Sequence, residues 1–223
     1  MACSFGEDYF SGVGSGYKSG YTWKTIGYLL WSHFRDVAFH SQYKSGRWLD
    51  AGCAKGFLLN IASQYGWEPF GFDISSYAIK EARRVCPSAH LLVLDAQSPL
   101  PFPSDFFEVI TACELIEHLT KPENFFEEAY RMLKPGGLLF ITTPNASSIV
   151  GFPLVKNVCQ AIKYPPFDDE SHVSYFSSKS ISKLLRRCGF SKVKTKHSWN
   201  LLWRVNIHIL SPVGWTLLAF AYR

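Results

Sequence analysis

Acidic and glycine residues recur in the first half of the chain, each at the end of an apolar segment. Asp50 ends the first segment, and Gly52 and Gly56 follow it; glycines there permit a tight turn whose backbone N–H groups lie close to a bound molecule. Asp73 ends the second segment, where a carboxylate can accept hydrogen bonds from both hydroxyls of a ribose. Asp95 ends the third, where an acceptor suits the amino group of an adenine. Together these residues predict a nucleoside site.

The elements that must position these residues alternate along the chain. Five short apolar segments are typical of buried strands: 47–51, 67–72, 89–94, 106–113 and 137–143. Three amphipathic segments are typical of helices: 56–65, 75–85 and 122–133. This alternation indicates parallel β-α-β units, so the chain is expected to have an α/β fold.

The helix expected at 122–133 has local start and stop signals. Thr120 and Glu123 have the spacing of a capping box, and Pro122 is tolerated in a first turn. Pro135 and Gly136 are expected to stop this helix and to begin the next strand.

Beyond Asn145 the pattern changes. Residues 146–176 are irregular, and we interpret them as a substrate-side insertion over one end of the sheet. A helix is expected over 179–188, followed by strands at 191–197 and 215–222. The connection between these two strands is too short for a right-handed crossover, so they are expected to form an antiparallel hairpin.

Residues 1–44 carry no strand pattern and are expected to form an N-terminal lid and helical segment, with a helix near 22–39. The remaining residues, 45–223, are expected to form the main domain. Three tyrosines either close over the site or pack the N-terminal helix on the sheet: Tyr9, Tyr17 and Tyr21.

Composition favours a single globular domain of 223 residues, 47% apolar and 18% charged. Six cysteines without CxxC or zinc-like spacing predict a reduced, cytoplasmic protein, and neither a signal peptide nor a membrane-spanning run is recognised.

After Glu170 there are nine Lys or Arg residues and no acidic one. This basic region, which includes the apolar stretch Trp199–Trp215, is either a solvated surface or a peripheral contact with a membrane or a lipid-linked substrate. No nucleic-acid partner is predicted, and the oligomeric state stays open.

Over residues 45–222 the chain resembles the class I S-adenosylmethionine-dependent methyltransferases. Residues 50–56 resemble their glycine-rich first motif, with Ala54 in place of its middle glycine. Asp73 matches the ribose-binding acid and Asp95 the acid beside the adenine. The segment from Asp105 to His118 is similar to their fourth strand and its sequel, and Leu133–Gly137 to the turn before their fifth. Within the family, the Glu-x-x-Glu-His segment is similar to that of ubiquinone-biosynthesis-type O-methyltransferases.

The resemblance implies a Rossmann-like, seven-stranded, mostly parallel sheet of order 3-2-1-4-5-7-6, with strand 7 antiparallel and helices on both faces. It implies S-adenosyl-L-methionine as cofactor, S-adenosyl-L-homocysteine as product, and methyl transfer to a small-molecule acceptor, at oxygen. The implied cofactor-binding residues are Asp50, Gly52, Cys53, Gly56, Asp73, Ile74, Asp95, Ala96 and Cys113.

Three further residues are candidates for catalysis. His118, just past the fourth strand, has a pKa suited to a general base, although it can instead order its loop by a hydrogen bond. Glu117, with Glu114, can bind substrate or, with His118, a divalent metal; a single Glu–His pair is half a site, so no metal site is predicted. His172 either faces the pocket from the insertion or lies at the surface.

Two other functions fit parts of the pattern. A dinucleotide-dependent oxidoreductase requires Gly-x-Gly-x-x-Gly, whereas the spacing here is Gly52-x-x-x-Gly56, and it has no use for Asp95. A non-catalytic binding module on the same fold would fail to bind S-adenosylmethionine.

Overall fold

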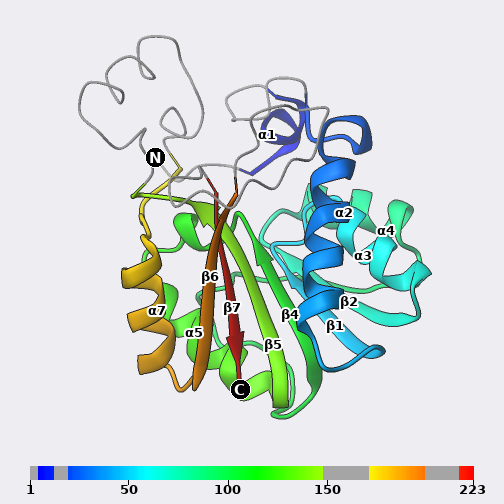
Figure 1. Cartoon of the computed structure of the whole chain (residues 1–223). Helices are drawn as coiled ribbons and strands as arrows, with labels where there is room; N and C mark the ends of the chain where they lie inside the picture. Colours follow the sequence, from blue (N-terminus) through cyan, green and yellow to red (C-terminus); the bar gives the residue numbers. More distant parts are fainter. Residues whose placement is uncertain (1–4, 13–19, 148–170, 199–215) are drawn as a thin grey trace, which may run out of the picture.

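The computed structural model of the chain describes residues 5–12, 20–147, 171–198 and 216–223. Its centre is a seven-stranded sheet of order β3-β2-β1-β4-β5-β7-β6 (Figure 1). The strands are β1 (Gly46–Ala51), β2 (Trp67–Asp73), β3 (His90–Val93), β4 (Phe107–Cys113), β5 (Leu133–Pro144), β6 (Lys192–Ser198) and β7 (Thr216–Tyr222). Strands β1 to β5 pair in parallel, and β7 runs antiparallel to both β5 and β6. The expected sheet order and terminal hairpin are confirmed.

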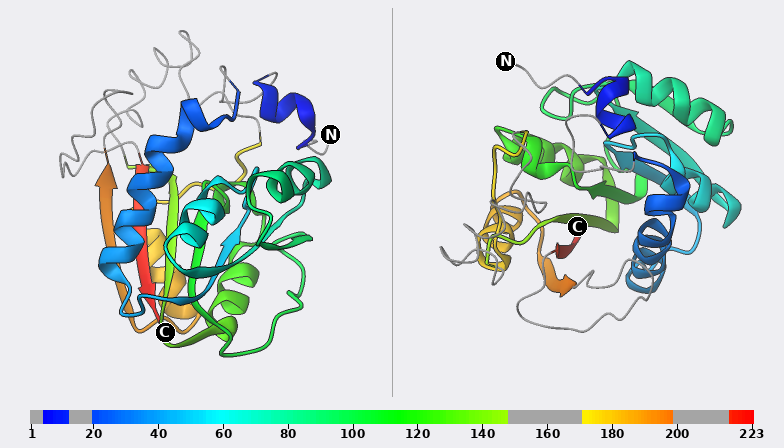
Figure 2. Two further views of the ribbon diagram at one scale, coloured as in Figure 1. Left: turned by 90° about the vertical axis from the view of Figure 1, so that its right-hand side faces the viewer. Right: turned by 90° about the horizontal axis from the view of Figure 1, so that it is seen from above.

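Helices cover both faces of the sheet (Figure 2). They are α1 (Glu7–Ser11), α2 (Trp23–His40), α3 (Phe57–Gln64), α4 (Ser76–Val85), α5 (Pro122–Met132), α7 (Ser178–Arg187) and the short 3₁₀ helix η1 (Ile116–His118). On one face, Phe34 of α2 stacks on Trp48 of β1 at a ring-centroid distance of 5.6 Å. On the other face, Phe125 of α5 and Leu185 of α7 are fully buried in a second apolar cluster.

Helix α2 belongs to this core. Its apolar residues Ile26, Leu30, Phe34 and Val37 recur at helical spacing and are all buried. At its start, Thr22 and Thr25 bond each other's backbone in a capping box, which satisfies amide groups that a helix N-terminus leaves without partners. The helix expected near 22–39 is therefore present, and it packs against the sheet that carries the site.

Two local expectations were wrong. The capping box at Thr120 does not form, because Thr120 donates its hydroxyl hydrogen bond to Gln97 Oε1 at 2.7 Å and α5 begins after Lys121 without a side-chain cap. Strand β5 begins at Leu133 rather than at 137, because the Pro135–Gly136 pair lies inside the strand at a register shift. There Gly136 N donates to Arg223 O at 2.8 Å, so the chain continues as strand through the turn-like sequence.

Some expectations lie outside the described residues: Tyr17, residues 148–170 of the insertion and most of the stretch Trp199–Trp215. In the part of the chain that the structure describes, no helix has the length and apolarity needed to cross a bilayer.

Candidate active site

A pocket lies at the carboxyl ends of β1, β2 and β4, the edge of the sheet over which α1 is placed (Figure 1). In open α/β sheets, ligands bind at the carboxyl ends of the strands, in the crevice that forms where the strand order reverses. The lining residues come from the N-terminal segment, from the strand ends with the loops that follow them, and from η1 with its flanks: Phe5, Tyr9, Phe10, Tyr21, Gly52, Ala54, Phe72, Asp73, Ile74, Leu94, Asp95, Ala96, Gln97, Cys113, Glu114, Leu115, His118 and Leu119.

The floor of the pocket is the turn between β1 and α3. Gly52, Ala54 and Gly56 all have positive φ, at 69°, 46° and 73°. A left-handed conformation costs a residue with a Cβ roughly 1–2 kcal/mol, so Ala54 holds a strained position where the family has glycine. The turn keeps its shape despite this cost, and the methyl group of Ala54 becomes part of the pocket wall.

Asp73 ties this turn to the end of β2. Its Oδ2 accepts a hydrogen bond from Ala54 N and its Oδ1 one from Ser75 N, both at 2.9 Å. Burial raises the pKa of Asp73, and the two backbone donors counteract that shift. A carboxylate has about four lone-pair sites, so each oxygen retains one after these bonds. Asp73 can therefore accept hydrogen bonds from two adjacent hydroxyl groups.

The end of β3 supplies the next wall. Asp95 accepts a hydrogen bond from Gln97 N at 2.9 Å, which folds the chain back after the strand. Ala96 is buried beside it, and Ile74, which follows Asp73, is half exposed at the rim. Gln97, which sequence reasoning missed, accepts hydrogen bonds from Thr120 and thereby joins this wall to the loop after η1.

Six of the residues implied as cofactor-binding line the pocket, and three lie behind it. Asp50 is buried beneath the turn, where it accepts a hydrogen bond from the Thr111 hydroxyl at 2.6 Å. Cys53 packs in a separate apolar cluster. A Cβ at Gly56 would lie 2.9 Å from the Cβ of Ala82, so this glycine permits the close approach of α3 and α4.

Of the three candidate catalytic residues, His118 lines the far wall of the pocket, and Glu117 and His172 lie beside His118. Glu117 is 1% exposed, and its Oε2 accepts a hydrogen bond from the Thr143 hydroxyl at 3.0 Å. Burial first, and the neighbouring Glu114 carboxyl second, hold the pKa of Glu117 well above its usual range. His118 lines the pocket, and its ring lies 4.9 Å from that of His172. The structure thus brings all three together.

Hydrogen bonds between distant segments produce this arrangement. Val173 N and Ser174 N both donate to Glu117 O, at 2.8 and 3.0 Å, and the Ser174 hydroxyl donates to Leu119 O. His118 Nδ1 lies 3.2 Å from the backbone oxygen of Ser171. The Ser171 hydroxyl oxygen lies 3.0 Å from the same ring nitrogen, so Ser171 holds His118 through both its backbone and its side chain.

Aromatic residues of the N-terminal segment cover the pocket. The Phe5 ring meets the edge of His118 at a centroid distance of 5.5 Å, and the Phe10 and Tyr21 rings are 5.8 Å apart. Tyr21 N donates to Phe10 O at 2.9 Å, which ties α1 to the chain before α2. Sequence reasoning picked out Tyr9 and Tyr21 but missed Phe5 and Phe10, whose surroundings give no periodic signal.

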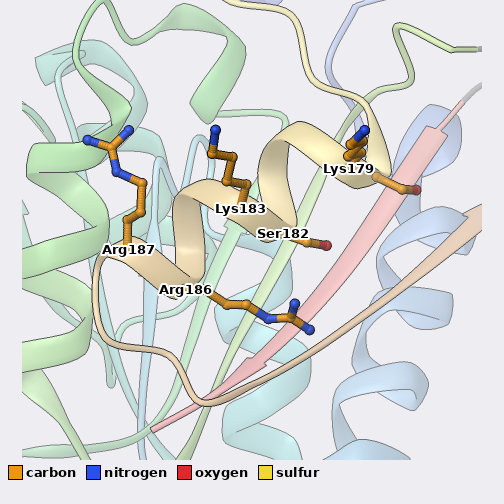
Figure 3. A pocket seen from close by; sticks show the side chains of 6 residues that line it. Lys179, Ser182, Lys183, Arg186 and Arg187 are labelled. Carbon is orange, nitrogen blue, oxygen red and sulfur yellow. The ribbon is translucent and has the colours of Figure 1, made fainter.

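A second, shallow hollow lies on the surface of α7 and is chemically different (Figure 3). Exposed basic residues at helical spacing line it: Lys179, Lys183, Arg186 and Arg187. The helix contains no acidic residue to pair with them. This basic face of α7 has none of the carboxyl groups that line the first pocket.

Residues 24–195 match the family model described as a methyltransferase domain, so the chain belongs to this family. With the sheet order and the pocket described above, the chain is a class I S-adenosylmethionine-dependent methyltransferase. The oxidoreductase and non-catalytic alternatives are set aside.

Several curated relatives of the chain are named O-methyltransferases. The chain is 28% identical over 191 residues to a ubiquinone biosynthesis O-methyltransferase of Methylococcus capsulatus, covering 84% of this chain and 80% of that protein. It is 30% identical over 133 residues to a malonyl-[acyl-carrier protein] O-methyltransferase of Enterobacter lignolyticus; that match covers 60% of this chain and only 49% of the relative.

Solved structures of methyltransferases share the fold. A methyltransferase of Thermotoga maritima, described as a possible histamine N-methyltransferase, superposes with a TM-score of 0.68 at 19% identity, covering 90% of this chain and 92% of that one. A phosphoethanolamine N-methyltransferase of Haemonchus contortus, solved with S-adenosylhomocysteine, gives 0.62 at 17% identity, covering 86% and 52%.

The chemistry of the pocket residues fits S-adenosylmethionine, because Asp73 offers two hydrogen-bond acceptors to the two adjacent hydroxyl groups of its ribose. The cavity volume is about 130 Å³, below the roughly 300–1,000 Å³ usual for ligand pockets. Phe5, Tyr9 and Phe10 contribute to its walls.

Proposed function

We propose that this methyltransferase transfers a methyl group to an oxygen atom of a small-molecule acceptor. The observation that carries the proposal is the cluster of Glu114, Glu117, His118 and His172 beside the cofactor pocket. Carboxylate and imidazole groups can activate a hydroxyl, whereas a neutral amine needs little activation. The names of the O-methyltransferase relatives support oxygen as the acceptor atom.

Positioning is the first task of the site residues. Asp73 and Asp95 would hold the ribose and the adenine, with Gly52, Ile74, Ala96 and Cys113 forming the walls between them. When bound, S-adenosylmethionine supplies an electrophilic methyl group on a sulfonium. Correct alignment of that methyl group with the acceptor is worth up to roughly 7–11 kcal/mol. The acceptor hydroxyl would be activated for loss of its proton by three residues: Glu117, His118 and His172.

Cofactor binding tests the first half of the proposal. Titration calorimetry is expected to show S-adenosylmethionine binding to the wild type and at least about a hundredfold weaker binding to Asp73→Ala, because two hydrogen bonds to a charged acceptor contribute roughly 1.5–3 kcal/mol each. Glu127→Ala, which removes an exposed carboxylate on α5, is the matched control and should bind normally. Equal affinity in Asp73→Ala and wild type would contradict the assignment of Asp73.

The mass of the reaction product tests the second half of the proposal, that the acceptor atom is an oxygen. Reactions with quinol, sugar-alcohol and amine acceptors are scanned for the gain of a single methyl group. Methylation of hydroxyl acceptors supports the proposal, and methylation of amines alone overturns it.

We further propose that the protein acts in the cytoplasm, where its thiols stay reduced, and that the basic face of α7 contacts an anionic membrane. The described cysteines Cys53, Cys86, Cys113 and Cys188 are free thiols. Each Lys or Arg near an anionic lipid surface contributes about 1 kcal/mol.

Vesicle sedimentation tests the membrane contact. Vesicles containing phosphatidylglycerol are expected to retain the wild type at low salt, and replacement of Lys179, Lys183, Arg186 and Arg187 by Gln should weaken retention at least about tenfold. Lys80→Gln with Arg83→Gln on α4 is the control for loss of positive charge. Retention that is equal for all three proteins, or absent for the wild type, would remove this proposal.

A further inference from the structure

Helix α1 is held against the body of the protein through Phe10. The side chain of Phe10 is 4% exposed and lies in an apolar cluster with Ala54 and Ala78. Both views of Figure 2 show α1 beside α4, whose second and third residues are Tyr77 and Ala78. A helix of five residues is not stable in isolation, so the position of α1 depends on such contacts.

Lys55 adds a charged contact to this cluster. Its Nζ lies 5.8 Å from the centroid of the Phe10 ring and 5.8 Å from the centroid of the Tyr77 ring. The centroids of the two rings are 6.1 Å apart, so the ammonium group bridges them. A cation within about 6 Å of a ring centroid is attracted by the negative face of the ring. Lys55 thus joins an aromatic ring of α1 to an aromatic ring of α4.

Two adjacent residues of the turn between β1 and α3 make this attachment. Ala54 stands where the family has glycine, and it contributes its methyl group to the cluster around Phe10. A glycine at position 54 would relieve the strain of the positive φ but would have no side chain to contribute. Lys55 follows directly, so the turn supplies both an apolar and a charged contact to the same ring of α1. The attachment of α1 therefore accounts for the unusual residue in the first motif.

The attachment lies directly behind one wall of the pocket. Phe10 and Ala54 line the pocket, whereas Lys55 is not among its lining residues. Tyr77 lies four positions after Asp73, the residue proposed to hold the ribose. The ammonium group of Lys55 can therefore act on a bound cofactor only through the aromatic wall that it holds in place.

We propose that Lys55 is a positioning residue that fastens α1 over the pocket and thereby slows the release of S-adenosylmethionine. This inference rests on the part of the proposed function that places the cofactor in this pocket. The charge of Lys55 and the ring of Phe10 are its two physical components, and each can be removed separately. Lys55→Met keeps an unbranched apolar side chain without the charge, whereas Lys55→Arg keeps a cation that can lie over the rings.

Two measurements on the full chain test the attachment and its consequence separately. Amide hydrogen exchange at Tyr21, whose N–H donates to Phe10 O at 2.9 Å, reports the detachment of α1 in the absence of cofactor. Stopped-flow displacement with S-adenosylhomocysteine gives the dissociation rate of S-adenosylmethionine. Lys55→Met is expected to raise both rates about three- to tenfold, and Lys55→Arg should keep them within about twofold of the wild type. Lys192→Met, which removes a cation 5.2 Å from the centroid of the Tyr222 ring, is the matched control and should leave both rates unchanged.

A double-mutant cycle isolates the contact between Lys55 and Phe10. Phe10→Leu removes the ring but keeps an apolar side chain in the cluster. In this background Lys55→Met should change neither rate further, because the cation then has no ring of α1 to hold. Unchanged rates in Lys55→Met, rates raised equally in Lys55→Met and Lys55→Arg, or an undiminished effect in the Phe10→Leu background would overturn the proposal.

The two measurements also distinguish this proposal from the proposed function. If Lys55→Met speeds exchange at Tyr21 but the wild type does not bind S-adenosylmethionine, the proposed function fails and the attachment of α1 stands. If the wild type binds S-adenosylmethionine and exchange at Tyr21 does not respond to Lys55→Met, only the role of Lys55 fails.

Discussion

Replacement of His118 by alanine is expected to slow methyl transfer to a hydroxyl acceptor by about 10²–10⁴-fold while S-adenosylmethionine still binds. His118 lines the pocket at the end of η1, and Ser171 holds the Nδ1 side of its ring. In the proposed function the imidazole takes the acceptor proton, so its removal leaves the acceptor hydroxyl unactivated. Single-turnover rates with an acceptor found by the mass scan measure the effect.

A second variant separates chemistry from loop ordering. His118→Gln retains a side-chain N–H that can donate to the Ser171 carbonyl, but its amide nitrogen is not basic. If His118 only orders its loop, His118→Gln should react at nearly the wild-type rate, which would refute a role in activation. Rates equally low in both variants, with His90→Ala unaffected, are the expected result.

Replacement of Asp50 by asparagine is expected to stabilise the protein at pH 8 by up to about 4 kcal/mol. Burial raises the pKa of Asp50 to about 7, and Asp73 adds to the shift, while the hydrogen bond from Thr111 opposes it. In the unfolded chain this carboxyl ionises near its usual pKa of 3.8. The folded state therefore loses stability as the pH rises from about 4 to about 7, because it keeps a proton that the unfolded chain has released.

Urea unfolding at several pH values measures this effect. Asparagine has nearly the same shape as aspartate, and its side-chain oxygen can still accept a hydrogen bond from the Thr111 hydroxyl. Asp50→Asn should therefore remove the contribution of this group to the pH dependence of the free energy of unfolding. The two proteins should be equally stable near pH 4 and should diverge towards pH 7. Glu68→Gln, at an exposed carboxyl of β2, controls for the change in net charge. Parallel stability curves for Asp50→Asn and the wild type would contradict the assignment.

The spacing of residues along the chain predicted the fold because β-α-β units impose it locally. Asp73 is the last residue of β2, and Asp95 lies two positions beyond the end of β3, so the strand pattern alone placed both at the edge of the sheet that carries the pocket. The same pattern could not tell which side chains of the first turn face inward. Cys53 and Asp50 belong to the motif but lie behind the pocket, since positive φ angles at Gly52 and Ala54 redirect the chain.

The features that could not be predicted from the sequence depend on contacts between distant segments. Thr120 has the spacing of a helix cap, yet Gln97 captures its hydroxyl from another loop. His172 is 54 positions after His118, and the two rings meet through hydrogen bonds between their segments, such as those of Val173 and Ser174 to Glu117. Helix α1 is short and lies in a Gly- and Tyr-rich segment, so its cover over the pocket has no periodic signal.

The two ends of the segment between β5 and α7 are joined to each other. Asn145 and Phe176 form a parallel bridge, and Ala146 N donates to Phe176 O at 2.9 Å. The backbone amides of Val173 and Ser174 donate to Glu117 O, so the chain on the β6 side of this bridge is tied to η1 as well. Two independent attachments therefore set the position of His172, one to the end of β5 and one to the end of η1.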